Sequence, residues 1–267
     1  MPSHFADPAA ARRYARGRPS LHHQVIERLV EHLPDGPVGL AVDVGCGTGQ
    51  SSRPLAALAC TVLGLDASLA MLAAADRPSP ALFACAEAEA LPLALSRAGL
   101  LTVGLAFHWF DRRRFLAEAS RVLEPGGVLA VYDSWCTGRM PEEPAFASWW
   151  TDEYLARFPS PPRDRRPLAE ADLVPGGLEV EAGVAFESEL TMDAASFVAY
   201  LTTQTNVIAA VERGASLRDV ERDLGTATQP FFGPGRRSIL FGHSLTVARR
   251  LPRAGRCHGP GTLDLAR

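Results

Sequence analysis

Lysine is absent from this chain: all 27 basic residues are arginine, and asparagine occurs once, at Asn206. We attribute this bias to a GC-rich genome rather than to chemistry. With 30 acidic residues the net charge is −3. The bulk charge therefore gives no reason to expect nucleic acid or an anionic membrane surface as a partner.

Cysteines are few and widely spaced. The five thiols are odd in number and include no C-x-x-C pair. This argues against a zinc knuckle or a disulfide framework and favours reduced thiols in a cytoplasm. No histidine pair has the i, i+4 helical spacing with a carboxylate that is typical of metal sites, so we expect no metal.

Long apolar runs are also missing. The longest candidate, residues 100–110, contains His108 and is shorter than the ~18 residues of a membrane span. The N-terminal segment lacks the apolar core of a signal peptide. A chain of 267 residues with 47% apolar and 21% charged residues has a globular composition, which excludes disorder, collagen and coiled coil. We expect a soluble, cytoplasmic protein with no membrane partner.

Short apolar runs alternate with helical stretches from residue 38 onwards. The pattern predicts strands at 40–45, 61–66, 81–86, 100–107, 128–133, 178–190 and 237–249. It predicts helices at 50–59, 68–76, 111–123, 193–211 and 217–224. This alternation is typical of βαβ units, and near-continuous apolar strands are expected where helices cover both faces of a parallel sheet. The predicted fold class is α/β, with a doubly wound, mostly parallel sheet of seven strands.

The composition changes after Trp135. Residues 136–176 contain seven of the 21 prolines and the pair Trp149-Trp150. We expect an insertion that closes over a site; an irregular surface segment without a role is the alternative. The predicted organisation is an N-terminal helical cap (1–37), a core (38–135), a lid or insertion (136–177), a C-terminal part of the sheet with helices (178–250) and a disordered tail (251–267).

The most informative stretch is the turn DVGCGTG at 43–49, which joins the first strand to a helix. Glycines allow a tight turn and a close approach of backbone to ligand, and the next helix offers its N-terminal amides. Such a turn indicates a nucleotide-like cofactor. A NAD site would read G-x-G-x-x-G, but Gln50 stands at the last position.

Asp66 closes the second strand. A carboxylate at this place can accept hydrogen bonds from both hydroxyls of a ribose, as in dinucleotide sites. The alternative is a helix cap before Ser68. The nearby glycine turn favours the ribose.

Five segments, VDVGCGTG, GLDAS, CAEAEALP, AFHWFD and VLEPGGVLAVYD, resemble in order and spacing the class I S-adenosylmethionine (SAM)-dependent methyltransferases. The similarity is greatest to the small-molecule methyltransferases of the UbiE/type 11 group, including the trans-aconitate methyltransferase-like branch. It implies a Rossmann-like methyltransferase fold whose SAM-binding core is 38–135. It also implies SAM as cofactor and a small-molecule methyl acceptor as partner. We further expect a monomer or a homodimer.

The resemblance places the cofactor along one edge of this core. Gly45, Gly47 and Gly49 would cradle its methionine part, and Asp43 would be oriented towards the ammonium group, directly or through water. The other implied cofactor contacts are Asp66 at the ribose, Ala67 beside the adenine, Glu87 at the adenine amino group, Ala88 through its backbone amide, Phe107 at the end of the fourth strand, and Tyr14 closing the pocket. The alternative for Glu87 is a solvated loop acid, and for Tyr14 a cap helix packed on the core.

Methyl transfer requires an acceptor held close and aligned, and it requires a base only if the acceptor must lose a proton. His108 is the histidine that we place at the site, as base or substrate ligand; packing beside Trp109 is the alternative. We expect Trp109 to form a wall of the substrate pocket. The substrate candidates by location are Trp135 and Gln204. Three arginines, Arg163, Arg165 and Arg166, could recruit an anionic acceptor or simply form a solvated face.

Two departures from the family pattern are visible. Arg97-Ala98-Gly99 stands where the family commonly reads S-x-D, which affects the local stability of the fourth strand. Thr203-Gln204-Thr205-Asn206 replaces a T-x-S block flanked by aromatics. We therefore expect a methyl acceptor other than the one after which the branch is named.

The predicted function is SAM-dependent transfer of a methyl group to an O or C atom of a small organic molecule, with carboxylates and natural-product intermediates as candidates. The alternatives are an NAD(P)-dependent oxidoreductase and a SAM-binding module without methyl transfer. A nucleic-acid methyltransferase is disfavoured, because AFHWF stands where an N/D-P-P-Y/F block would follow the fourth strand.

Overall fold

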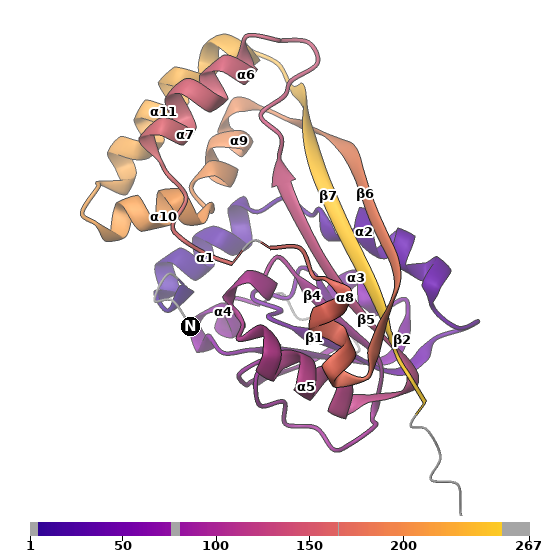
Figure 1. Ribbon diagram of the computed structural model, residues 1–267. Helices are drawn as coiled ribbons and strands as arrows, with labels where there is room; N and C mark the ends of the chain where they lie inside the picture. Colours follow the sequence, from indigo (N-terminus) through magenta and orange to yellow (C-terminus); the bar gives the residue numbers. More distant parts are fainter. Residues whose placement is uncertain (1–4, 76–80, 165, 253–267) are drawn as a thin grey trace, which may run out of the picture.

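The computed structural model describes residues 5–75, 81–164 and 166–252. Within these residues the chain forms a seven-stranded sheet in the order β3-β2-β1-β4-β5-β7-β6 (Figure 1). The strands are β1 (Val38–Val44), β2 (Ala59–Asp66), β3 (Ala81–Cys85), β4 (Ala98–Gly104), β5 (Leu123–Cys136), β6 (Leu178–Met192) and β7 (Arg237–Arg250). Strands β1 to β5 pair in parallel, and β7 runs antiparallel to β5 and β6. The predicted fold class is confirmed.

Helices cover both faces of the parallel strands. On one face, α5 (Arg112–Val122) buries Phe115 and Leu116, and Asp111 caps this helix by accepting a hydrogen bond from the Arg114 amide at 3.1 Å. On the other face lie α2 (His22–Leu29) and α3 (Ser52–Leu55). The carboxyl ends of β1, β2 and β4 lie at one edge of the sheet, and open α/β sheets bind their ligands at such an edge.

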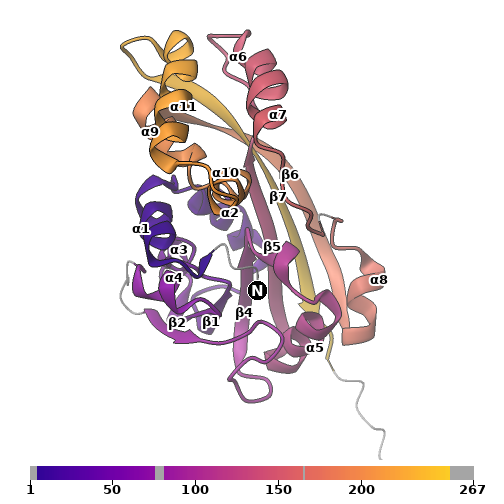
Figure 2. The same cartoon turned by 90° about the vertical axis from the view of Figure 1, so that its left-hand side faces the viewer.

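The long strands β5, β6 and β7 extend beyond the parallel strands and carry a helical lobe at their far end (Figures 1 and 2). This lobe consists of α6 (Phe146–Ser148), the π-helix η4 (Trp149–Tyr154), α7 (Leu155–Arg157), α9 (Ala194–Leu201), α10 (Thr205–Glu212) and α11 (Leu217–Phe232). Its core is aromatic, with Phe146, Phe197 and Phe232 fully buried.

Helix α1 (Pro8–Gly17) joins the lobe to the sheet. Gly17 lies directly against α9: a Cβ at this position would be 2.6 Å from the carbonyl oxygen of Ala199. The other helical segments are η2 (Val30–His32), α4 (Leu69–Ala73), η3 (Phe107–Trp109), α8 (Glu170–Leu173) and η5 (Val174–Gly176). None of the helices in the described ranges is long and apolar enough to cross a membrane.

Three predicted helices differ from those observed. The helix at 50–59 shrinks to α3, because the following amides bond three residues back and form tight turns. The helix at 193–211 is interrupted between α9 and α10, where the Thr203 hydroxyl donates to the Tyr200 carbonyl at 2.6 Å; such local bonds compete with helical ones. The helix at 217–224 continues to Phe232.

Two predicted strand ends also shift. The strand at 100–107 ends at Gly104, because Leu105 adopts a positive φ of 60° and the chain then forms the 3₁₀ turn η3. The strand at 128–133 is the middle of a longer β5, which follows β7 as far as Cys136. The expected disordered tail lies outside the described residues, apart from 251 and 252.

Candidate active site

The glycine turn after β1 has the geometry that the sequence predicted. Gly45, Gly47 and Gly49 all adopt positive φ angles, of 73°, 55° and 78°. Residues other than glycine rarely adopt this backbone conformation. A Cβ at Gly45 would lie 2.6 Å from that of Ala106. The Gly45 amide donates to the carbonyl of Leu65 at 2.7 Å, which ties the turn to β2.

Asp66 ends β2 beside this turn. Its carboxylate is 6% exposed and accepts hydrogen bonds from the amides of Gly47 and Ser68, both at 2.8 Å. Burial raises the pKa of this carboxyl above its usual range, while the two amides act in the opposite direction. Ser68, rather than Asp66, caps α4, because its hydroxyl accepts from the Met71 amide.

A small cavity of about 60 Å³ lies against the glycine turn. Asp66 lines it, as do Thr48 and Gln50, whose buried side-chain oxygens Oγ1 and Oε1 have no hydrogen-bond partner. Phe5 and Tyr14 form its roof; their rings meet edge to face with centroids 5.9 Å apart. The Phe5 carbonyl is held by the Ser68 hydroxyl at 2.6 Å.

Asp43 lies beneath the turn and does not line the small cavity. The carboxylate is fully buried and accepts hydrogen bonds from the hydroxyls of Ser51 (2.7 Å), Ser52 (2.6 Å) and Thr102 (3.1 Å). Burial raises its pKa, and the three hydroxyls oppose this. These three hydrogen bonds tie the glycine turn to α3 and β4 and leave about one acceptor site of the carboxylate for a further donor.

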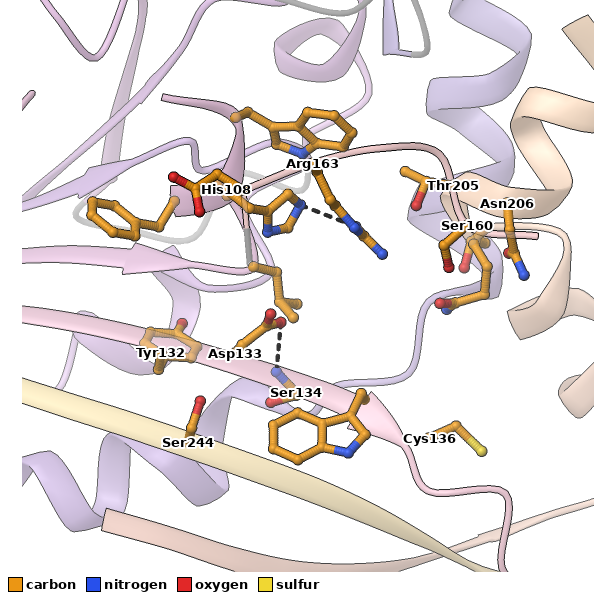
Figure 3. A pocket seen from close by; sticks show the side chains of 18 of the residues that line it. His108, Tyr132, Asp133, Ser134, Cys136, Ser160, Arg163, Thr205, Asn206 and Ser244 are labelled. Atoms are coloured by element: carbon orange, nitrogen blue, oxygen red, sulfur yellow. Dashed lines mark hydrogen bonds between the residues drawn. The ribbon is translucent and has the colours of Figure 1, made fainter. Parts of the chain in front are cut away.

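A larger cavity of about 540 Å³ lies between the sheet edge and the helical lobe (Figure 3). It brings together six of the predicted residues: Tyr14, Phe107, His108, Trp109, Trp135 and Gln204. Five residues line both cavities: Phe5, Tyr14, Leu105, Ala106 and Trp109. The two cavities are therefore adjacent and separated by a shared wall.

Five predicted cofactor residues line neither cavity: Asp43, Gly49, Ala67, Glu87 and Ala88. Glu87 is exposed, as its alternative role of a solvated loop acid requires, and Ala88 is buried in the core. Gly49 acts within the turn, where its amide donates to the Cys46 carbonyl at 2.8 Å.

His108 lies in η3, just past the end of β4, and its ring is held by Arg163. The guanidinium Nη1 is 3.1 Å from Nε2 of His108 (Figure 3). Because arginine is always a donor, Nε2 accepts and the proton of a neutral ring is on Nδ1. The Trp109 ring lies 4.7 Å from that of His108.

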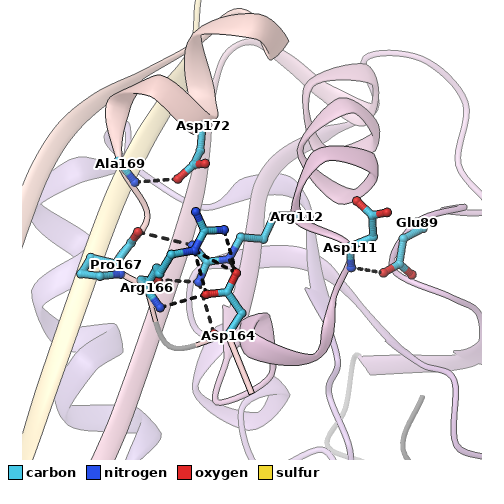
Figure 4. A network of polar contacts seen from close by, with 8 residues as sticks. All are labelled: Glu89, Asp111, Arg112, Asp164, Arg166, Pro167, Ala169 and Asp172. Atoms are coloured by element: carbon cyan, nitrogen blue, oxygen red, sulfur yellow. Dashed lines mark hydrogen bonds and ion pairs between the residues drawn. The ribbon is translucent and has the colours of Figure 1, made fainter. Parts of the chain in front are cut away.

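The segment around Arg163 is anchored to α5. Asp164 forms ion pairs with Arg112 at 3.1 Å and with Arg166 at 2.8 Å (Figure 4). The hydrogen bonds from Arg166 lower the pKa of Asp164 to about 2. Arg166 is thus engaged by an acid, and Arg165 lies outside the described residues.

Sequence reasoning missed several residues of the larger cavity. Arg18 lies four residues after Tyr14 in the same helical segment, and Tyr132 lies in β5 three residues before Trp135. Trp150 and Tyr200 come from the helical lobe. Arg18, Tyr132 and Tyr200 each lie within four residues of a predicted one, and Trp150 belongs to the tryptophan pair of the predicted insertion, but proximity in sequence does not show which side chains face the cavity. Within the described residues, no group of three His, Cys, Asp or Glu side chains is arranged to hold a metal ion.

A glycine turn and an acid at the carboxyl edge of such a sheet define the nucleotide-binding core of a class I methyltransferase fold. Residues 42–131 match the family of methyltransferase domains Methyltransf_11, and this part of the chain is a methyltransferase domain. The resemblance to the type 11 methyltransferases is thereby confirmed, and none of the similar proteins supports the oxidoreductase alternative.

Two named methyltransferases are similar to a part of the chain. A malonyl-[acyl-carrier protein] O-methyltransferase from Enterobacter lignolyticus is 38% identical over 112 residues, which cover 41% of this chain and 45% of the relative. A trans-aconitate 2-methyltransferase from Deinococcus radiodurans is 40% identical over 102 residues, 37% of this chain and 39% of the relative. The chain thus spans about half or less of the length of these relatives.

One solved structure matches over nearly its whole length. It is a protein from Anaeromyxobacter dehalogenans, provisionally assigned as a type II methyltransferase. It is 29% identical, covers 86% of this chain and 97% of its own, and superposes with a TM-score of 0.68. The similarity therefore extends well beyond residues 42–131.

Proposed function

We propose that this protein is a SAM-dependent methyltransferase that methylates an O or C atom of a small organic acceptor. The observation that carries the proposal is the shared wall between the two cavities. One cavity lies on the glycine turn and Asp66, and the other has the size of a small-molecule site. A cofactor in the first and an acceptor in the second would meet at Leu105, Ala106 and Trp109.

The residues of the small cavity fit SAM. When bound, SAM supplies a methyl group on a cationic sulfur, which is the reactive part of the chemistry. The Asp66 carboxylate is suited to the ribose hydroxyls. Thr48 and Gln50 carry buried oxygens without partners, and such groups are costly unless a ligand pairs with them. The ammonium group of the methionine part would provide donors for these oxygens.

The roof of the small cavity must move when the cofactor binds. A free volume of about 60 Å³ is far too small for a nucleoside. Phe5 and Tyr14 cover the turn and belong to the N-terminal segment, which is held to α4 by the bond between Ser68 and Phe5. We infer that this segment lifts to admit SAM and then closes on it, with Tyr14 over the pocket.

The insertion predicted at 136–177 supports the acceptor site. Trp150, Tyr154, Ser160 and Arg163 come from it and line the larger cavity. We propose that this segment forms the outer wall of the acceptor pocket and excludes water there, as in-line methyl transfer requires.

Calorimetric titration with S-adenosylhomocysteine (SAH), with NAD in parallel, tests the cofactor. We expect micromolar binding of SAH and none of NAD. Incubation with SAM and a fractionated cell extract then tests turnover, measured as SAH formed. Binding of NAD in place of SAH would overturn the proposal. SAH binding without turnover in any fraction would reduce the protein to a SAM-binding module.

A further inference from the structure

The tyrosines and tryptophans of this chain are concentrated around the larger cavity. Only 7% of the residues are Phe, Trp or Tyr, and the chain has four tyrosines and four tryptophans. All four tyrosines line this cavity: Tyr14, Tyr132, Tyr154 and Tyr200. Three of the four tryptophans line it as well: Trp109, Trp135 and Trp150. Aliphatic side chains would be sufficient to wall an ordinary apolar pocket.

Two of the three indole rings pack directly against a glycine. The Trp135 ring lies over Gly242 of the neighbouring strand β7, where a Cβ would be 2.6 Å from the ring. The Trp150 ring lies over Gly138 in the same way. Any side chain at either glycine would displace the indole, so the backbone is built to hold these rings in place. Trp135 is nevertheless 46% exposed, which leaves one face of its ring available.

The cavity also holds Arg18, whose guanidinium makes no direct ion pair among the described residues. Arg18 lies between two aromatic rings, 5.5 Å from the centre of Tyr14 and 5.3 Å from that of Tyr200. Its buried Nε has no hydrogen-bond partner in the part of the chain that the structure describes. Asp133 also lines the cavity, and its charge acts on Arg18.

A second unpaired donor lines the same cavity. The side-chain nitrogen Nε2 of Gln204 is buried and without a partner. The two buried donors, Nε of Arg18 and Nε2 of Gln204, favour a ligand that supplies acceptor oxygens, because unpaired buried donors are destabilising. A carboxylate is such a ligand, and arginine binds it with both charge and geometry.

We propose that the methyl acceptor is an aromatic acid, whose planar ring packs against Trp135 and Trp150 and whose anionic group is bound by Arg18 and Gln204. This inference rests on the proposed function and specifies its substrate class. The cavity volume of about 540 Å³ lies within the ~300–1,000 Å³ of small-molecule sites. Flat aromatic ligands gain from stacking on such rings, whereas a flexible aliphatic acid does not.

The experiment uses the full chain saturated with SAH and compares probes by calorimetry. The probes are a set of hydroxybenzoates and hydroxycinnamates, octanoate as an aliphatic anion, and the amide of the best aromatic acid as its uncharged counterpart. We expect at least one aromatic acid to bind about tenfold more tightly than octanoate and than its own amide. Equal binding of octanoate, or of the amide, would overturn the inference.

Variants locate the binding site. Trp150→Leu and Gly242→Ala are each expected to weaken binding of the aromatic acid about tenfold and to leave SAH affinity unchanged. Trp149→Phe is the matched control: Trp149 neighbours Trp150 in the same π-helix but does not line the cavity, and we expect no change. Unchanged affinity for the aromatic acid in both Trp150→Leu and Gly242→Ala would refute the packing of its ring against Trp135 and Trp150.

Arg18→Gln separates two sources of a carboxylate. If the acceptor provides it, the variant loses the preference for the acid over its amide and keeps its SAH affinity. If SAH affinity falls instead, Arg18 binds the carboxylate of the cofactor, and the anionic half of the inference is wrong. A wild-type protein that fails to bind SAH would overturn the proposed function itself, before any acceptor is tested.

Discussion

Arg163 donates a hydrogen bond to Nε2 of His108 at 3.1 Å. This contact occupies the ring nitrogen that a general base would use and fixes the other nitrogen as a donor. A base needs a free lone pair within reach of the proton it removes. The geometry therefore favours a role for His108 in binding or positioning the acceptor.

His108→Gln tests this role. Glutamine can present an oxygen to Arg163 but cannot act as a base at neutral pH. We expect kcat to fall less than about tenfold and the KM for the acceptor to rise. A fall in kcat of ~100-fold or more, together with loss of a titration near neutral pH from the rate profile, would restore His108 as the base.

Asp66→Ala is expected to weaken SAH binding by ~1–3 kcal/mol, the penalty for unpairing buried donors. Calorimetry measures it. Glu87→Gln is the control, because Glu87 is exposed and lines neither cavity. An equal loss in Glu87→Gln would support the adenine contact implied by the family resemblance, and normal SAH affinity in Asp66→Ala would refute the ribose assignment.

The pH dependence of SAH binding provides a second check on Asp66. Only the ionised carboxylate accepts from both ribose hydroxyls, and burial raises its pKa. We expect affinity to fall on acidification, starting at a higher pH than for an ordinary aspartate. An affinity that is flat across the acidic range would contradict this.

Asp43→Ala should lower the free energy of unfolding by ~1–3 kcal/mol, because three hydroxyls lose a buried acceptor. The three partners are Ser51, Ser52 and Thr102. Denaturant unfolding measures the change, and exposed Asp35→Ala is the control. A stable variant that loses SAH binding would show instead that Asp43 contacts the cofactor directly.

His22 makes stability depend on pH. Its Nδ1 lies 2.9 Å from the Tyr132 hydroxyl, and burial, together with the charge of Arg18, lowers its pKa to about 3. The unfolded chain takes up a proton near pH 6.5 and the folded protein does not, so stability falls as the pH drops from about 6.5 to about 3. This residue contributes at most ~1.4 kcal/mol per pH unit.

Denaturant unfolding of His22→Asn, measured between about pH 6.5 and about pH 3, tests whether His22 causes this loss of stability. Asparagine keeps an acceptor near the position of Nδ1 but cannot titrate. We expect the free energy of unfolding to depend less steeply on pH in this variant. The dependence that remains would come from His243, whose pKa is also lowered by burial. An unchanged slope would exclude His22 as the source.

The glycine turn and Asp66 were predictable because their geometry is local. A positive φ at three glycines and a carboxylate at the end of the next strand are properties of short segments. The hydrogen bonds of Asp43 were not predictable from the sequence, since one partner, Thr102, comes from β4. No short-range pattern reveals that a strand far along the chain supplies a hydroxyl.

The acceptor cavity was less predictable for the same reason. Tyr200 and Trp150 reach it only because the helical lobe packs against α1 and the long strands. Gly138 and Gly242 read in sequence as ordinary turn or strand glycines. Their purpose is visible only once an indole ring lies over each.

Phe5 and Tyr14 roof the small cavity and also wall the larger one. A ligand that lifts them to reach the glycine turn reshapes the surface against which the second ligand packs. We expect compulsory-order kinetics, with cofactor bound first and SAH released last. Inhibition by SAH would then be competitive towards SAM and noncompetitive towards the acceptor.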